Sequence, residues 1–136
     1  MQVSEIMHKG IVTANINDSV KKVAELMKNE DIGALPVMEE NKPVGFVTDR
    51  DIVISCIAEG YDIEKSISHA MSENIISVKE DEEIEEVNRL MQKNQISRVL
   101  VVDEQEQPIG IVSLKDIASL QDEDLSGETV TRIKEP

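Results

Sequence analysis

An internal repeat is the feature that most constrains the fold of this 136-residue chain. Met71 lies 64 positions after Met7, and one inserted residue later lengthens the spacing to 65. The matching pairs are Met7 and Met71, Ile11 and Ile75, Val23 and Val87, Val37 and Val101, Gly45 and Gly110, and Asp51 and Asp116. Because the matches keep their order over about 45 residues with a single gap, duplication explains them better than chance. We therefore expect two similar halves.

Each copy predicts a short strand, a helix, a β-hairpin and a second helix. Apolar residues at Val20, Val23 and Met27 follow the spacing of an amphipathic helix, and the second copy repeats it. In the first copy we expect a strand near Ile11-Val12, an Asn17 N-cap, hairpin strands over 34–38 and 44–48, and a helix over 49–58. In the second we expect an Asp81 N-cap, hairpin strands over 99–102 and 109–113, and a helix over 114–120.

These elements predict an α+β fold of two pseudo-symmetric β-α-β-β-α repeats, each a small sheet with helices packed on one face. Such a sheet cannot bury its apolar side alone, so the two copies are expected to pack together. The expected domains are 1–60 and 61–120, joined by a linker at 59–66 and followed by a flexible acidic tail at 121–136. Pro36 within a strand predicts an edge or a bulge, because proline cannot donate to a ladder.

Composition excludes several classes of function. A net charge of −14, with one Phe and one Tyr, opposes nucleic-acid binding, which uses basic residues and aromatic stacking. We find no apolar run suited to a signal peptide or a membrane span, and one Cys excludes an internal disulfide. We therefore expect a cytoplasmic protein with no nucleic-acid or membrane partner.

Three further residues are interpreted structurally. Cys56 is expected to be a buried, inert thiol on one helical face with Ile52, Val53 and Ile57. His8 and His69 precede the first strands of the two copies and are interpreted as surface or packing residues. None of the three is predicted to react or to bind a metal.

Each copy ends in the same kind of octet, GFVTDRDI from Gly45 and GIVSLKDI from Gly110. Thr48 and Ser113 each precede an Asp by three residues, which fits a helix capping box. In this arrangement the hydroxyl caps the helix and the acid bonds back to the backbone. A role in binding a ligand is compatible with the same geometry, so both interpretations stay open.

The whole pattern resembles a tandem pair of CBS domains, the Bateman module. The resemblance covers residues 1–120 and is carried by the two closing octets, by Leu35-Pro36-Val37, and by Ser97-Arg98-Val99-Leu100-Val101. The chain also resembles the small stand-alone prokaryotic proteins that consist of a CBS pair and little else. This resemblance implies a non-enzymatic regulatory module that binds AMP, ADP or ATP, and less often S-adenosylmethionine, in the clefts between the repeats. It implies a homodimer, an unidentified regulated protein, no catalytic cofactor and no metal.

The resemblance also implies the site residues. Asp51 and Asp116 would accept hydrogen bonds from ribose hydroxyls, since a carboxylate offers two acceptor oxygens to a diol. Gly45 and Gly110 would let backbone and ligand approach closely. The expected contact set is Thr13, Ala34, Thr48, Arg50, Asp51, Ser77, Arg98, Ser113, Lys115 and Asp116. Adenine would lie near Ile11-Val12-Thr13 or Ile75-Ile76-Ser77, and the basic members would face phosphate.

Two other classes of function were considered. In a ligand-independent dimeric scaffold, both octets would serve only as helix caps. An enzyme such as a nucleotide hydrolase would need a phosphate-binding loop, a metalloprotease motif or a nucleophile set, and the sequence contains none of these. Asp49 and Asp51 are spaced to hold Mg²⁺ beside ATP, but hydrolysis also needs a positioned water. We therefore expect no enzymatic activity.

Overall fold

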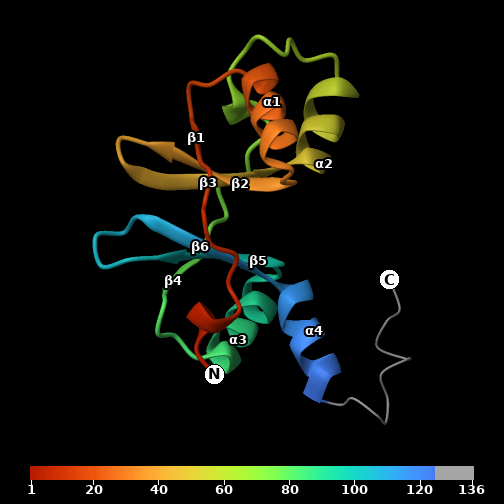
Figure 1. Ribbon diagram of the computed structural model, residues 1–136. Helices are drawn as coiled ribbons and strands as arrows, with labels where there is room; N and C mark the ends of the chain where they lie inside the picture. The colour runs from red at the N-terminus through yellow and green to blue at the C-terminus, as the bar shows by residue number, and fades with distance from the viewer. Residues whose placement is uncertain (125–136) are drawn as a thin grey trace.

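The computed structural model describes residues 1–124 and shows two halves stacked in four layers (Figure 1). Each half has a three-stranded sheet with helices on its outer side, and the two sheets face each other in the middle. The α+β fold of two pseudo-symmetric repeats, with helices on one face of each sheet, is confirmed.

The elements of the two halves correspond one to one. The first half contains β1 (Ala14–Asn15), α1 (Val20–Glu30), β2 (Ala34–Glu39), β3 (Lys42–Thr48) and α2 (Asp49–Ile52), which continues into a π-helical turn at Val53–Ile57. The second contains β4 (Ser77–Lys79), α3 (Ile84–Asn94), β5 (Arg98–Val102), β6 (Pro108–Ser113) and α4 (Leu114–Asp124). Short 3₁₀ turns at Val3–Glu5 and Ile67–His69 precede the halves. Of the predicted tail, residues 121–124 continue α4, and 125–136 lie outside the described residues.

Apolar side chains form three cores. In each sheet the outer strand runs parallel to the central strand, which pairs antiparallel with the third. One core lies between helices and sheet in each half, and a third lies between the sheets around Phe46, Leu100 and Val102. Because the central strands β2 and β5 are buried on both faces, the sheets cannot separate without exposing apolar surface.

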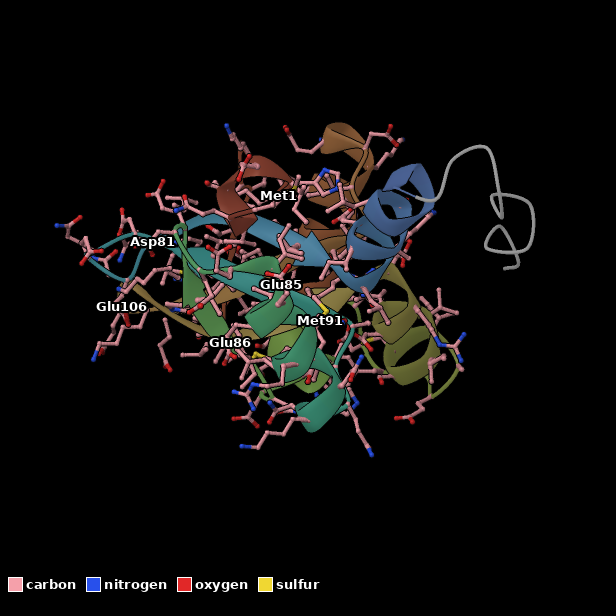
Figure 2. The ribbon with its side chains drawn as sticks, turned by 90° about the horizontal axis from the view of Figure 1, so that it is seen from below. Met1, Asp81, Glu85, Glu86, Met91 and Glu106 are labelled. Carbon is pink, nitrogen blue, oxygen red and sulfur yellow. The ribbon has the colours of Figure 1, made fainter. Side chains whose placement is uncertain are left out.

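The segment that leads into each half, residues 1–13 before β1 and 65–76 before β4, is called its leader segment. Each leader segment completes the core of the other half. Val3 is fully buried in the second core, and its N–H donates to the Glu82 carbonyl at 2.8 Å. Ile67 is fully buried in the first core, where its N–H donates to the Asp18 carbonyl at 2.8 Å. Viewed from below in Figure 2, Met1 lies near the helices of the second half. Neither 1–60 nor 61–120 therefore holds a complete core, and these domain limits remain a prediction.

The leader segments also explain why the predicted N-caps are wrong. Helix α1 begins after Ser19, whose hydroxyl accepts from the Lys22 N–H, because Asn17 takes part in a turn closed by the Asn15 side chain. Helix α3 begins after Glu83, and no side chain caps it. Instead, the Ile84 N–H donates to the Met1 carbonyl at 3.0 Å. Backbone from the other half thus satisfies donors that a helix start leaves free.

Gly45 and Gly110 make room for these leaders. Phe46 and Ser72 exchange two backbone hydrogen bonds of 2.9 and 2.7 Å beside Gly45. A Cβ on Gly45 would lie 2.6 Å from the Ser72 carbonyl oxygen, and one on Gly110 would collide with the Met7 thioether. The expectation that these glycines make room for a ligand is therefore corrected, since the approaching groups belong to the leader segments.

Pro36 explains why the first strand is shorter than its counterpart and begins later than predicted. In the second half the Leu100 N–H donates to the Ile76 carbonyl at 3.0 Å, and β4 pairs from Ser77 onward. Pro36 occupies the position of Leu100 but has no N–H, so β1 pairs only from Ala14. Of the two alternatives predicted for Pro36, the edge is wrong because β2 is the central strand. An irregularity of the bulge type is present close by, where the register with β3 shifts between Val37 and Met38.

The apolar residues after α2 divide between core and surface. Cys56 is fully buried, as predicted, and Ile52 packs in the same core. Val53 and Ile57, predicted for the same face, are 56% and 61% exposed. The helix widens here into a π-turn, closed by the Ala58 N–H and the Val53 carbonyl, and this changes which side chains face inward. No helix within residues 1–124 is long and apolar enough to cross a membrane.

Replacing Val3 with Ala tests whether the first leader segment contributes to the core of the second half. We expect the free energy of unfolding to fall by about 1.5–3 kcal/mol, because a fully buried side chain of the second core is truncated. Urea unfolding followed by circular dichroism measures the loss. Ser4→Ala is the control, since the contact of Ser4 with the Glu80 carbonyl is made by its backbone. Equal stability of the two variants would show that the leader does not contribute to the core.

Replacing Gly45 with Ala tests the close approach of the leader. The new Cβ meets a backbone carbonyl, which cannot rotate away, so we expect a loss of about 1–3 kcal/mol. Gly33→Ala is the control because the three atoms nearest to its Cβ would all belong to the exposed Asp49 carboxylate, the closest at 3.1 Å. Thermal unfolding of the two variants should differ clearly. A Gly45→Ala protein as stable as the control would contradict this account.

Candidate functional site

A cleft of about 420 Å³ opens between the two halves. One wall is the leader segment from His8 to Val12, and another is the turn from Asp31 to Ala34, which joins α1 to β2. The second half contributes Arg98 from β5, residues of β6 and the first turn of α4. The volume falls within the range usual for small-molecule sites.

Backbone pairing fixes the leader along one side of the cleft. The His8 N–H donates to the Ile111 carbonyl at 2.9 Å, and the Ile111 N–H returns a bond of 3.1 Å to the His8 carbonyl. The leader therefore runs antiparallel to β6, which ends at Ser113, where α4 begins. As a result, His8 and the first turn of α4 meet at the same end of the cleft.

Asp116 occupies this end with both carboxylate oxygens engaged. Oδ2 accepts the Ser113 N–H at 2.8 Å, and the Asp116 N–H donates to the Ser113 hydroxyl at 3.1 Å, which completes a capping box. Oδ1 lies 3.0 Å from His8 Nε2. Burial by itself raises the pKa of the Asp116 carboxyl, but the hydrogen bonds from Ser113 and His8 outweigh this and hold the pKa below its usual value. The cleft thus contains a carboxylate that stays ionised.

The structure brings four of the predicted contact residues together in this cleft, namely Ala34, Arg98, Ser113 and Asp116. Arg98 is half-buried, and with Lys9 it supplies fixed positive charge to the lining. Asp31 and Asp116 supply the negative charge. The cleft is therefore mixed in sign, although the sequence as a whole is strongly acidic.

A second group of predicted residues forms the equivalent structure in the first half. The Thr48 N–H donates to Asp51 Oδ2 at 2.9 Å, and the Asp51 N–H donates to the Thr48 hydroxyl at 3.1 Å. Both closing octets therefore form capping boxes, and this confirms the structural interpretation of the two motifs. Their role in ligand contact stays a prediction.

The remaining predicted residues lie outside the cleft. Arg50 and Lys115 are exposed on the first turns of α2 and α4, and Ser77 is exposed on β4. Thr13 is exposed too and lines a separate polar groove of about 390 Å³, together with Asn41 and Gln107. The structure does not gather these four side chains around Asp116.

Sequence reasoning missed His8 and Lys9. His8 was interpreted as a surface or packing residue, and it is indeed 73% exposed, but its ring contacts Asp116 in the cleft. His69 instead stacks on Tyr61 with ring centroids 4.0 Å apart, so the two histidines are not equivalent. The structural counterpart of His8 is Ser72, which forms the matching bridge to Phe46. The 64-residue spacing of the repeat pairs His8 with Ser72 and not with His69. This pairing was the sequence signal that the two histidines differ.

Comparison with known proteins assigns the family. The model of the CBS domain matches residues 3–56 and again residues 65–123. The chain belongs to the CBS-domain family, as a tandem pair.

A relative of similar length and a solved structure extend this assignment. The CBS domain-containing protein YhcV of Bacillus subtilis is 34% identical over 132 residues, which span 96% of this chain and 94% of the relative. The structure is also similar to the CBS domain pair of protein MJ0100, solved with 5′-methylthioadenosine and S-adenosyl-L-methionine. That pair has a TM-score of 0.78 and 34% identity, with 91% of this chain and 98% of that chain covered.

Similarity to enzymes is confined to one part of them. Inosine-5′-monophosphate dehydrogenase of Methanocaldococcus jannaschii is 32% identical over 117 residues, which are 85% of this chain but only 23% of that enzyme. A CBS pair is a regulatory ligand-binding module, and that is the class of protein to which the fold assigns this chain.

Replacing Asp116 with Asn tests the electrostatics of the cleft. Because the folded state lowers the pKa of Asp116, ionisation stabilises the fold above the unfolded-state pKa of about 4 and ceases to do so as the pH falls through the lower folded-state value. We therefore expect the variant to be less stable near pH 7, and the difference to shrink as the pH falls below about 4. Urea unfolding at pH 7 and at a series of lower pH values measures this. A stability difference that does not change with pH would contradict the assignment.

Proposed function

We propose that this chain is a non-enzymatic sensor that binds AMP, ADP or ATP in the cleft containing Asp116. The single observation that carries the proposal is the ionised Asp116 carboxylate, held by a capping box in a cleft between the two halves that Lys9 and Arg98 also line. A sensor of this kind needs neither a catalytic cofactor nor a nucleophile.

The ribose would be held by Asp116. A vicinal diol has two O–H donors, and a carboxylate has about four lone-pair positions, of which the Ser113 N–H and the His8 ring occupy two. Hydrogen bonds to an ionised acceptor are about twice as strong as neutral ones. The capping box fixes the carboxylate before the ligand arrives, so little ordering is needed on binding.

Adenine would lie against the leader segment. Ile11, Ile32 and Ile111 give the cleft apolar walls without aromatic rings. Since Pro36 has no N–H, it cannot bond the Val12 carbonyl in the way that Leu100 bonds the Ile76 carbonyl. The Val12 carbonyl is therefore a suitable acceptor for the exocyclic amine of adenine.

Phosphate groups would lie toward Lys9 and Arg98. These two side chains line the cleft, and this supports a nucleotide in preference to a ligand without phosphate. The related pair of MJ0100 is bound to 5′-methylthioadenosine and S-adenosyl-L-methionine, so these two ligands belong in any test. Lys115 and Arg50 are exposed on the helices beside the two aspartates and would reach only the outermost phosphate.

The equivalent position in the first half would form a second, weaker site around Thr48 and Asp51. The spacing of 64 places Glu73 where the first cleft has Lys9, and Ser72 where it has His8. The same spacing replaces Asp31 with Gln95, so the number of acids is unchanged, and the loss of two basic side chains disfavours phosphate. We propose that Ser77 and Thr13 contact the ligand only at the outer ends of the two sites, since both are exposed.

The proposed sensor acts as a cytoplasmic homodimer that signals to a regulated protein. Val53, Ile54, Ile57 and Leu114 are exposed on the α2 extension and at the start of α4, and they would form the dimer contact. The cleft draws on both halves, so a ligand that bridges them favours one relative arrangement over another. Nucleic acid and membrane are not among the proposed partners.

Isothermal titration with AMP, ADP, ATP, S-adenosylmethionine and 5′-methylthioadenosine tests this function. We expect binding of at least one adenine nucleotide, weakened about 10- to 100-fold by Asp116→Ala, because charge-assisted hydrogen bonds are lost. Asp51→Ala is the comparison variant, since it removes the equivalent cap in the other half. It should lose only the weaker second site and leave the affinity of the Asp116 cleft unchanged. If none of the five ligands binds, the alternative of a ligand-independent scaffold replaces the sensor.

A further inference from the structure

The cleft contains a titratable contact that its counterpart lacks. His8 Nε2 lies 3.0 Å from Asp116 Oδ1, the same carboxylate that the proposed function assigns to the ribose. In the first half the matching residue is Ser72, whose backbone makes the same bridge to β3. Of the two carboxylates proposed to bind ribose, Asp116 therefore has a histidine beside it and Asp51 does not.

The geometry places His8 in competition with an incoming ligand for the Asp116 carboxylate. Oδ2 of Asp116 accepts the backbone N–H of Ser113 within the capping box, whereas the partner of Oδ1 is the exposed imidazole of His8. A ligand can therefore displace the contact at Oδ1 more easily than the contact at Oδ2. The His8 backbone is fixed by two hydrogen bonds to Ile111, so the ring stays within reach of the carboxylate. A protonated imidazole holds a carboxylate more strongly than a neutral one does, because the bond then joins opposite charges.

We propose that His8 competes with the ribose of the ligand for Asp116, so that this cleft loses affinity as the pH falls through the range in which histidine gains a proton. The inference rests on the proposed function, because it concerns how the same site is regulated. Only one of the two proposed ligand sites, the cleft containing Asp116, would then respond to acidity.

The other charged groups around His8 do not supply this dependence. Lys9 adjoins it, Arg98 and Asp31 line the same cleft, and Asp116 faces it from α4. Among these residue types, histidine alone ordinarily changes charge between pH 5 and pH 8. The lowered pKa of Asp116 keeps that carboxylate ionised throughout this range. A change of affinity there is therefore due to His8.

The expected effect is modest. The His8 side chain is 73% exposed, and ion pairs in such positions contribute little because water and salt screen them. We expect about a two- to fivefold loss of affinity on protonation.

Adenosine is the probe, because it is uncharged and so is not attracted to a protonated histidine through phosphate. Its dissociation constant is measured by isothermal titration at about pH 8 and about pH 5.5, for the parent protein and for His8→Ser. This substitution copies Ser72 and leaves the backbone bridge in place. His69→Gln is the matched control, since His69 is the only other histidine and stacks on Tyr61. Each protein is also titrated in an Asp51→Asn background, which weakens the second site.

We expect the pH dependence in the parent and in His69→Gln, and its loss in His8→Ser. Between about pH 5 and pH 8, titrations in buffers of different ionisation enthalpy should also show protons released on binding, since ligand and proton then exclude each other. Affinity that is constant with pH, that rises on acidification, or that depends equally on pH in His8→Ser would overturn the inference while leaving the sensor intact. Adenosine that fails to bind at about pH 8, together with the five ligands named above, would overturn the proposed function itself.

Discussion

Each half depends on the segment that leads into the other half, which contributes a core side chain and a backbone acceptor. The residues before the first half bury Val3 in the second core, and their Met1 carbonyl accepts the Ile84 N–H at the start of α3. The residues before the second half bury Ile67 in the first core, and Lys65 caps α1 in the same way. A helix start needs acceptors for its free N–H groups, and here tertiary contacts supply them. Folding of either half is therefore coupled to folding of the other.

The same exchange builds the candidate site. A leader that must cross from the second half to β1 runs along β6, and the stretch from His8 to Val12 becomes one wall of the cleft. The loss of one strand pair at Pro36 leaves the Val12 end of this stretch unpaired with β2. Asp116 is presented from the opposite side by a capping box that also begins α4. Stability and the proposed binding would thus use the same residues, which would limit the substitutions that this region tolerates.

Much of the fold was predictable because the duplication confirmed each local pattern twice. The helices, the hairpins and the two capping boxes all follow from spacing within a few residues. The predicted caps at Asn17 and Asp81 were wrong, because the residues that satisfy the helix starts are remote in sequence. In the site, Asp116 and Ser113 followed from the motif, whereas His8 did not. Its partner lies 108 positions away, and no local pattern joins them.

The sequence by itself determined two copies of one α+β unit, because periodicity and capping chemistry act over a few residues. It also determined the pairs of Gly, hydroxyl and Asp that close each copy. Only the tertiary structure decided that each leader completes the opposite half, that Gly45 and Gly110 make room for those leaders, and that His8 meets Asp116. These outcomes depend on which remote segments share a core and a cleft, and that is fixed by packing of the whole chain.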